Sequence, residues 1–303
     1  MKKFLIIGTS LICLTVIGIF TWQQLPYNAL SVPMFDTAPI DTPIVEEKPV
    51  VFTEFSIQTT NPKTELTELV GVDNMPMLLA INHIDISNLK KGMSVMVPDS
   101  FEHTSLKQFM PSEIPSAIGI TKLIVIYQRT QAFGLYENGI LVRSGPVSSG
   151  RQANSTPDGL YFANWKGKRI ISTVDDSWVI KWNFNIDSDN GIGLHQYALP
   201  GYPASHSCVR MFEYDAIWMY NWADQWILDD TGQTKIANGT PVIIYGPYEF
   251  EKNAPYTELV ANPKALEVSA DELNAVVSSY LETILKEQAH RENVITQQRK
   301  EVE

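Results

Sequence analysis

Lys122-Leu-Ile-Val-Ile-Tyr127 and Gln131-Ala-Phe-Gly-Leu-Tyr-Glu-Asn-Gly-Ile-Leu-Val142 set the fold class of this chain. The first run is apolar and β-branched, which favours a buried strand. In the second run, Phe133–Tyr136 and Ile140–Val142 flank Asn138-Gly139, and Asn-Gly is a strong signal for a two-residue hairpin turn. A strand followed by a β-hairpin is therefore predicted here.

Short strand-like runs continue downstream of the hairpin. Leu160–Asn164, Arg169–Thr173 and Trp178–Phe184 are separated by turns, and many short strands of this kind are typical of a β-sandwich or barrel-like sheet. The predicted fold class is therefore mainly β. Tyr214–Ile227 breaks the strand pattern with residues at helical spacing, so a helix is expected there.

Residues 248–303 are expected to form a helical C-terminal extension. Within it, Ser269–Leu285 places Leu273, Val277 and Ile284 on one face, which is the pattern of an amphipathic helix. The charged end, Lys286–Glu303, is predicted to be a solvated helix or tail. We expect this end to pack on the larger domain, with a partner protein as the alternative.

The N-terminus is expected to carry an export signal. Met1-Lys-Lys precedes a mostly apolar run from Phe4 to Phe20, so residues 1–22 are interpreted as a signal anchor or signal peptide. No clear Ala-x-Ala cleavage site follows, which favours an uncleaved anchor, with cleavage and secretion as the alternative. Residues 23–51 contain five prolines among polar residues and are expected to be an extended linker.

Residues 52–98 form a small α+β unit. Glu65–Val70 and Met75–Asn82 are predicted to be short helices, and Gly92–Pro98 alternates like a strand. This order resembles the later part of a lysin-motif (LysM) glycan-binding module. The usual opening strand and its Gly-Asp-Thr are not visible, and Asn61-Pro-Lys-Thr64 stands in their place. The alternative is a small packing domain without a ligand.

The reactive side chains gather in and before Gly201-Tyr-Pro-Ala-Ser-His-Ser-Cys-Val-Arg210. Cys208 is the one cysteine beyond the apolar N-terminal run, and His206 and His195 lie close to it in sequence. A thiol attacks as the thiolate, so a catalytic cysteine needs a neighbour that takes its proton. A single cysteine or histidine is usually structural, but the three together in a stretch rich in Gly and Pro favour a reactive site.

These residues resemble the signature of the L,D-transpeptidase catalytic domain: a histidine, a variable loop, then Ser/Thr-His-Gly-Cys, an aliphatic residue and Arg or Asn. Here the signature is His195 followed by Ser205-His206-Ser207-Cys208-Val209-Arg210. The resemblance extends over about residues 121–247 through the opening hairpin, Pro146–Gly150 with Ser155–Tyr161, and Asn238–Tyr245. Ser207 departs from the family glycine, and it would be strained if this position needs a positive φ.

The resemblance implies a β-sandwich-like catalytic domain and a role for each residue of the signature. Cys208 would be the nucleophile, and His195 would be the general base, oriented by a backbone carbonyl. His206 would help to position the thiolate and the substrate. Arg210 would bind a substrate carboxylate or make a structural ion pair. Ser205 and Ser207 are candidate substrate-binding residues.

Two further expectations concern the site. The backbone N–H groups of Ser207 and Cys208 are candidate oxyanion donors. The helix expected from Tyr214 would favour the thiolate if its N-terminus lay near Cys208. Among the tryptophans, Trp165, Trp178 and Trp182 are the candidates for lining a cleft.

Composition narrows the set of partners and cofactors. The net charge of the 303 residues is −11, and no basic stripe is present, so nucleic acid is not an expected partner. Cysteine and histidine form no cluster of metal-ligand spacing, so neither a metal nor another cofactor is expected. Export of a chain with one thiol outside the N-terminal run suits a bacterial envelope protein, facing the periplasm or cell wall.

By this resemblance, the expected substrates are peptidoglycan stem peptides, as donor and as acceptor, joined through a thioester on the cysteine. An L,D-carboxypeptidase uses the same acylation, as does attachment of a protein lysine to the wall. The alternative from another class is a catalytically inactive peptidoglycan-binding scaffold, with glycan strands bound by the LysM-like unit. The departure at Ser207 favours the scaffold, and the intact Cys208, His195 and His206 favour the enzyme.

Overall fold

The computed structural model describes residues 50–172, 175 and 177–302. The predicted membrane anchor and nearly all of the predicted linker lie outside the described residues. No helix within the described part of the chain is long and apolar enough to cross a bilayer.

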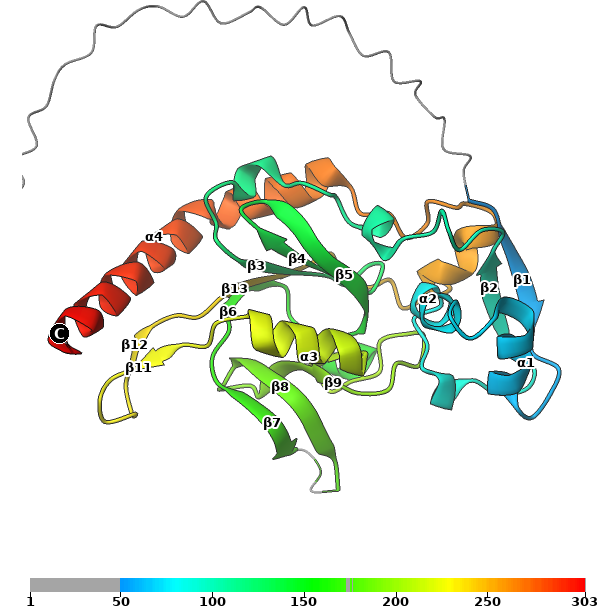
Figure 1. Ribbon diagram of the computed structural model, residues 1–303, viewed down its shortest axis with the longest axis horizontal. Coiled ribbons are helices and arrows are strands. Elements are labelled where there is room, and N and C mark those ends of the chain that lie inside the picture. Colours follow the sequence, from blue (N-terminus) through cyan, green and yellow to red (C-terminus); the bar gives the residue numbers. More distant parts are fainter. Residues whose placement is uncertain (1–49, 173–174, 176, 303) are drawn as a thin grey trace, which may run out of the picture. The chain divides into compact units, whose positions relative to one another are not determined.

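A curled nine-stranded sheet dominates the structure, with the strand order β6-β13-β3-β4-β5-β10-β9-β8-β7 (Figure 1). Its strands are β3 (Leu123–Tyr127), β4 (Ala132–Glu137), β5 (Ile140–Ser148), β6 (Gly159–Phe162), β7 (Lys166–Ile171), β8 (Val179–Asp187), β9 (Ile192–Gln196), β10 (Val209–Met211) and β13 (Pro241–Tyr245). A separate two-stranded ribbon pairs β11 (Ile227–Leu228) with β12 (Lys235–Ala237).

The predicted hairpin is confirmed as β4 and β5, which follow β3 in an antiparallel arrangement. Asn138 and Gly139 form its turn with φ of 48° and 81°, and two positive φ values are the mark of a type I′ turn. β5 is longer than predicted because it continues through Pro146 to Ser148. Pro146 lies opposite Ala132 of β4, while the pairing of β5 with β10 begins only at Val147.

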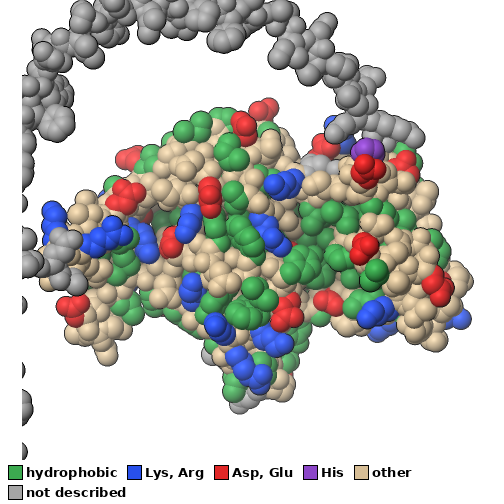
Figure 2. Space-filling model, viewed as in Figure 1, with side chains coloured by type: hydrophobic (Ala, Val, Ile, Leu, Met, Phe, Trp, Pro, Cys, Tyr) green, Lys and Arg blue, Asp and Glu red, His purple; other side chains and the backbone are tan. Residues whose placement is uncertain are grey.

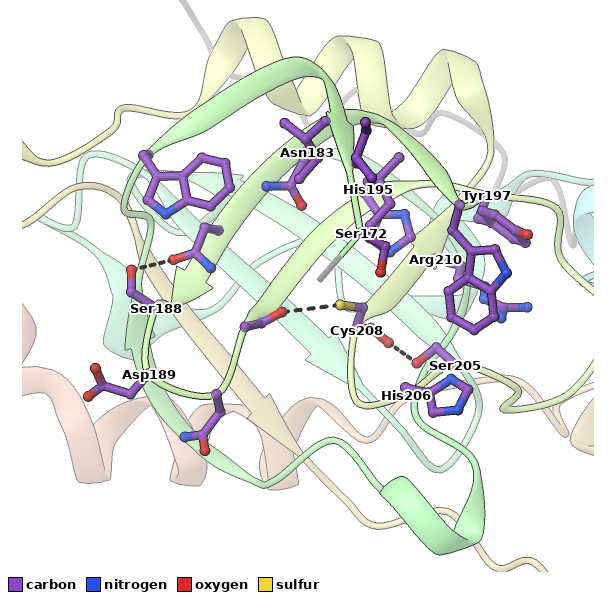
Figure 3. Close-up of a pocket in the computed structure, with 18 residues that line it drawn as sticks. Ser172, Asn183, Ser188, Asp189, His195, Tyr197, Ser205, His206, Cys208 and Arg210 are labelled. Carbon is purple, nitrogen blue, oxygen red and sulfur yellow. Dashed lines mark hydrogen bonds between the residues drawn. The ribbon is translucent and has the colours of Figure 1, made fainter. Parts of the chain in front are cut away.

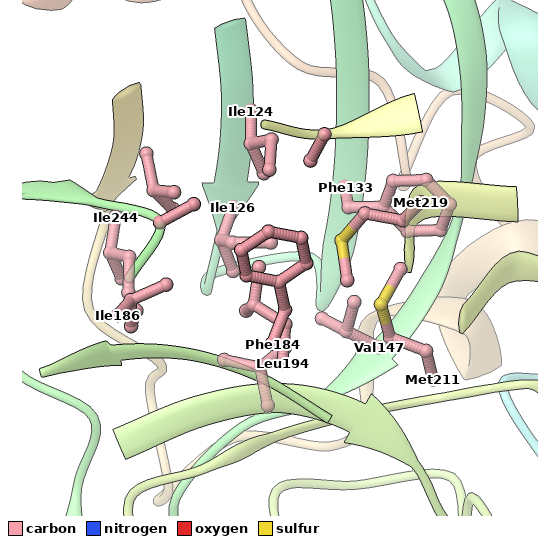
Figure 4. Packing of buried hydrophobic residues seen from close by; sticks show 14 of the residues in the cluster. Ile124, Ile126, Phe133, Val147, Phe184, Ile186, Leu194, Met211, Met219 and Ile244 are labelled. Atoms are coloured by element: carbon pink, nitrogen blue, oxygen red, sulfur yellow. The ribbon is translucent and has the colours of Figure 1, made fainter. Parts of the chain in front are cut away.

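β3 separates two hydrophobic cores, because successive side chains of a strand point to opposite faces. Ile124 and Ile126 face an inner core, where they meet residues of β8, β9 and β10 such as Phe184 and Leu194 (Figure 4). The same core joins both halves of the sheet, so the sheet curls around it. The mainly β, sandwich-like prediction is therefore confirmed.

Two helices cover this sheet. α3 (Glu213–Trp222) packs Ala216 and Met219 into the inner core. Its predicted extension to Ile227 is wrong: Ala223 is extended, with ψ of 147°, and Ile227 lies in β11. The backbone N–H of Asp224 then donates to Thr240 Oγ1 at 2.9 Å, which fixes the chain as it leaves the helix.

α4 (Ala270–Val302) covers the opposite face of β3. Its Leu273, Val277 and Ile284 share the second core with Val125 and Ile243, so packing on the domain is confirmed. Polar contacts hold the helix further along. Arg291 donates to the carbonyl oxygen of Asn238 at 2.7 Å, in the part predicted to be solvated. The charged end of the helix therefore packs on the domain as well and is not only solvated.

The small unit contains β1 (Phe52–Ser56), α1 (Pro62–Val70), α2 (Met75–Ile81) and β2 (Ser94–Pro98), with β1 antiparallel to β2. Both helices and the closing strand are confirmed. The opening strand was missed, because only Phe52 of β1 is fully buried and its other residues give no apolar run. Asn61 is the N-cap of α1, with Oδ1 accepting from the Thr64 N–H at 3.4 Å.

The small unit contacts the chain just ahead of the reactive motif. The backbone N–H of Asp85 and the side chain of Asn88 both donate to the Leu199 carbonyl oxygen, at 2.7 and 2.8 Å. Leu199 also packs with Ala80 and Phe212 in one cluster. The unit therefore supports the segment that leads to Cys208.

The hairpin turn gives a stability prediction with a matched control. Gly119→Ala and Gly139→Ala both force alanine into a left-handed conformation, at φ of 92° and 81°, which costs roughly 1–2 kcal/mol. A Cβ at Gly119 meets nothing within 4 Å, whereas one at Gly139 would lie 2.7 Å from the Ile114 carbonyl oxygen. We expect Gly139→Ala to lower the free energy of unfolding by a further ~1–3 kcal/mol, measured by urea denaturation. Equal losses in the two variants would contradict this geometry.

Candidate active site

β8, β9 and β10 present one face to the inner core and the other face to a pocket of about 490 Å³ (Figure 3). The alternation along each strand produces this division. Leu194 of β9 and Val209 of β10 lie in the inner core, while the next residues, His195 and Arg210, line the pocket. A shift of one residue in either strand would exchange the core residues for the pocket residues, so the packing of the core fixes the register that places His195 and Arg210 in the pocket.

Parallel pairing of β9 with β10 brings the predicted reactive residues together. Arg210 lies opposite His195 in this pairing, and Cys208 immediately precedes β10. His195 therefore lies within a strand, whereas Cys208 lies just before one. The Cys208 thiol donates weakly to the Gly191 carbonyl oxygen, at 3.5 Å. Cys208, His195, His206, Ser205 and Arg210 all line the pocket.

A backbone carbonyl orients the ring of His195, as expected. His195 Nδ1 lies 3.0 Å from the Gln196 carbonyl oxygen. A carbonyl only accepts, so we assign the ring proton to Nδ1 and the lone pair to Nε2. The side chain is 4% exposed, and this burial lowers its pKa to about 4, against a smaller opposing effect of the Gln196 carbonyl. At neutral pH, His195 is an uncharged proton acceptor.

The thiol of Cys208 is also uncharged at neutral pH. Burial raises its pKa, while the Gly193 N–H and the positive charge of Arg210 act in the opposite direction. β10 and Phe212 separate Cys208 from α3, which begins at Glu213. The groups that favour the thiolate are the Gly193 N–H and Arg210.

His206 lies between a cation and an aromatic ring. Its Nε2 is 2.7 Å from Arg151 Nη2, and its ring centroid is 5.3 Å from that of Trp178. Burial and the charges of Arg151 and Arg210 lower its pKa. Arg151 was not among the predicted site residues, because nothing in the sequence relates it to a histidine 55 positions away.

Ser205 and Ser207 hold the loop that carries Cys208. The Ser205 hydroxyl donates to the Cys208 carbonyl oxygen, and its backbone N–H donates to Ser149 at 3.1 Å. Ser207 has a φ of 75°, so the position does adopt the conformation that the family glycine suggests. Its hydroxyl donates to the Asn154 carbonyl oxygen at 3.2 Å and does not line the pocket.

Arg210 makes no ion pair within the described part of the chain. One guanidinium nitrogen donates to the Ala204 carbonyl oxygen at 3.1 Å, and the group lies 4.6 Å from the centroid of the Tyr197 ring. Of the two roles expected for Arg210, the structural ion pair is therefore not observed. Its remaining donors face the pocket side of β10.

Sequence reasoning missed several residues that line the pocket. Asn183 and Asn185 are buried on the pocket face of β8, and the alternation of Asn with Phe184 and Ile186 was the available signal. Of the three candidate tryptophans, Trp165 and Trp178 line the pocket, whereas Trp182 packs against Tyr220.

Lysine and arginine side chains gather on the β7–β8 hairpin, at the bottom of the view in Figure 2, where Lys168, Arg169 and Lys181 are exposed and do not line the pocket. In the β8–β9 turn, the exposed carboxylate of Asp189 lines the pocket. β7 is also an edge strand, where lysines discourage pairing with other sheets. Among the described residues, no group of three or more His, Cys, Asp and Glu is placed to hold a metal ion.

The charge states of the site predict how the thiol reacts with a neutral alkylating agent. Only the thiolate reacts, and below the thiol pKa its fraction rises about tenfold per pH unit. Because burial raises the pKa of Cys208 and His195 titrates only at about 4, we expect iodoacetamide labelling of the Cys13→Ser chain to rise steadily from about pH 6 to about 8.5. Cys208→Ala in the same chain is the blank. A plateau near neutral pH would instead indicate a preformed thiolate–imidazolium pair.

Comparison with known proteins identifies the domain around this pocket. Residues 121–244 match the YkuD family model, described as the L,D-transpeptidase catalytic domain. No protein with a curated description matches the chain. The match does not include residues 52–98, so it leaves the LysM-like resemblance unconfirmed.

Similar solved structures include L,D-transpeptidases from three organisms. The one from Stackebrandtia nassauensis has 21% identity and a TM-score of 0.34, over 42% of this chain and 56% of that chain. The one from Mycobacterium smegmatis has 18% identity and a TM-score of 0.33, over 42% and 59%. The one from Xylanimonas cellulosilytica has 28% identity and a TM-score of 0.31, over 41% and 60%. This chain thus covers less than two thirds of each. By the family match, residues 121–244 form an L,D-transpeptidase catalytic domain of the YkuD family.

Proposed function

We propose that this chain is a cysteine-dependent L,D-transpeptidase that acts on peptidoglycan stem peptides. One observation carries the proposal: the Cys208 thiol and the His195 ring line the same pocket of the family-matched domain, with His195 in β9 and Cys208 immediately before the parallel strand β10. A nucleophile and a base in one pocket are the minimum that acyl transfer through a thioester requires.

In the acylation step, Cys208 Sγ attacks the carbonyl carbon of the third stem residue and forms a C–S bond. The thiol proton passes to His195 Nε2, the nitrogen left free by the Gln196 contact. Backbone N–H groups of Ser207 and Cys208 are the candidate donors for the oxyanion. When the tetrahedral intermediate collapses, the C–N bond breaks, and the terminal D-alanine leaves as an amine that takes the proton from His195.

Both partners are neutral before the attack, so the proton moves as the C–S bond forms. A buried, uncharged imidazole with a low pKa is a weak base, and the reaction depends on the carbonyl being held in place. Arg210 suits this task, because its donors beyond the Ala204 contact can bind a stem-peptide carboxylate. Trp165 and Trp178 on the pocket wall supply apolar contact to the rest of the peptide.

The acceptor decides the product. An amine of a second stem peptide attacks the thioester, gives its proton to His195 and releases the Cys208 thiol, which leaves a cross-link between peptides. Water in the same position makes the chain an L,D-carboxypeptidase, and a protein lysine attaches a protein to the wall. These outcomes share the acylation step.

The setting that we propose is the bacterial cell envelope. Residues 1–22 would anchor the chain in the membrane or direct its secretion, residues 23–51 would extend from it, and the domain would face the periplasm or cell wall. The small unit at residues 52–98 would bind glycan strands if its LysM-like order reflects that function. The rival proposal is an inactive wall-binding scaffold, which rests on the serine at position 207.

Substitution of the nucleophile tests the proposal directly. We expect a carbapenem to add its mass to the wild-type chain and to Cys13→Ser, and Cys208→Ala to abolish the addition, because the thioester forms only on Cys208. The measurement is intact-mass spectrometry, with thermal melting to check that each variant folds. Labelling that survives in Cys208→Ala would show that the nucleophile is wrongly assigned.

The same proteins incubated with a disaccharide-tetrapeptide separate the functions. A cross-linked dimer indicates transpeptidation, and a tripeptide alone indicates the carboxypeptidase. If the wild type forms no acyl-enzyme yet binds purified sacculi, the scaffold is the better description.

Ser207→Gly tests whether the serine impairs the site. Glycine removes the strain of a left-handed residue, worth about 1–2 kcal/mol, and loses the hydroxyl contact with Asn154, worth about 0.5–1.5 kcal/mol. We therefore expect a melting temperature close to that of the wild type and an acylation rate that is equal or higher. A large loss of acylation in a folded Ser207→Gly variant would mean that the hydroxyl itself takes part.

A further inference from the structure

The contact between Arg151 and His206 determines where the ring proton of His206 lies. Arg151 Nη2 is 2.7 Å from His206 Nε2. A guanidinium only donates hydrogen bonds and keeps its charge at any pH of interest. Nε2 must therefore accept with its lone pair, which leaves the proton on Nδ1. His206 Nδ1 is buried and has no hydrogen-bond partner among the described residues.

The loop that carries Arg151 is tied to the motif loop at several points, so the contact is not an accident of two flexible side chains. The backbone N–H of Arg151 donates to the Ser205 carbonyl oxygen at 3.0 Å, and Arg151 Nε donates to Asn154 Oδ1 at 3.0 Å. From the same loop, the Thr156 hydroxyl donates to the Ser207 carbonyl oxygen at 2.9 Å. The guanidinium therefore approaches His206 from a fixed direction.

The charges around His206 also oppose its protonation. The charged groups that act on it are Arg151 and Arg210, both cations, while the neighbouring Cys208 is a neutral thiol. Trp178, from the β7–β8 hairpin, faces the ring without adding charge. Burial and these two cations lower the pKa of His206, so geometry and charge agree.

We propose that Arg151 is a positioning residue that holds His206 neutral with its proton on Nδ1, so that His195 alone carries protons during the reaction. The two histidines then differ in which ring nitrogen is hydrogen-bonded to the protein. In His195, Nδ1 donates to the Gln196 carbonyl oxygen, so Nε2 is free to accept a proton. In His206, Nε2 accepts from Arg151, so the remaining nitrogen, Nδ1, carries a proton and can only donate. The catalytic part of this inference rests on the proposed function, but the protonation state of His206 does not.

The test combines a direct and a functional readout on the full-length chain. The direct one is nitrogen NMR of histidine-labelled wild type, in which His206 should show a protonated Nδ1 and an unprotonated Nε2 and should not titrate between about pH 5.5 and 8. The functional one is the rate of acylation by a carbapenem against pH in wild type, Arg151→Lys and Arg151→Gln.

Without Arg151, the pKa of His206 rises toward its ordinary value, because only burial and Arg210 still lower it. Arg151→Gln should therefore lose rate at pH 5.5 relative to its own rate at pH 8, by at most about tenfold. Arg151→Lys retains a cation and should show a smaller fall. In Arg151→Ala, added guanidinium ion should restore the wild-type profile. Asn154→Ala removes the side-chain contact of Arg151 Nε but keeps the cation and the backbone hydrogen bonds of the loop. It is the control for loop damage, and its pH profile should stay closer to that of the wild type than the Arg151→Gln profile does.

The proposal is overturned if His206 in the wild type titrates near pH 6.5 or carries its proton on Nε2. It is equally overturned if the Arg151→Gln and wild-type pH profiles superimpose in folded protein. If the wild type is never acylated but His206 is neutral with its proton on Nδ1, the proposed function is contradicted and the protonation state assigned to His206 still holds.

Discussion

Parallel pairing of β9 with β10 is the constraint on which the rest of the site depends. β10 has only three residues, yet it joins the two halves of the sheet, antiparallel to β5 and parallel to β9. Val209 and Met211 anchor it in the inner core. A slip of one residue would turn these side chains into the pocket and Arg210 into the core. The free energy of core packing therefore also keeps Cys208 and His195 in the same pocket.

This construction leaves His195 buried, Cys208 half-buried and both groups uncharged, and desolvation is the largest cause of both pKa shifts. A protonated thiol is less easily oxidised than a thiolate, which matters for a lone cysteine in the envelope setting that we propose. In the resting site Cys208 is therefore a thiol and not the thiolate that attacks. Arg210 and the Gly193 N–H are the groups that favour the thiolate, so activation is expected to accompany substrate binding.

Sequence patterns predicted the elements that depend on local signals. The Asn138-Gly139 turn, the apolar β3 run and the α4 stripe were predicted because each is periodic or carries its own turn chemistry. β1 was missed because its burial comes from neighbours distant in sequence. The motif identified Cys208 and both histidines, but Arg151 was out of reach, since its role arises from a contact between loops 55 residues apart.

Ser207 is weak evidence for an inactive protein. Its φ of 75° costs roughly 1–2 kcal/mol, yet two hydrogen bonds from the same neighbouring loop hold the peptide in place. Its hydroxyl reaches Asn154, and its carbonyl oxygen accepts from Thr156, each worth about 0.5–1.5 kcal/mol. The hydroxyl bond, which glycine could not make, offsets part of the strain. Both hydrogen bonds of Ser207 connect the loop at residues 205–208 to the segment that carries Arg151. Ser207 and Arg151 therefore hold the same loop, and the backbone at Ser207 can keep the left-handed conformation for which glycine is otherwise suited.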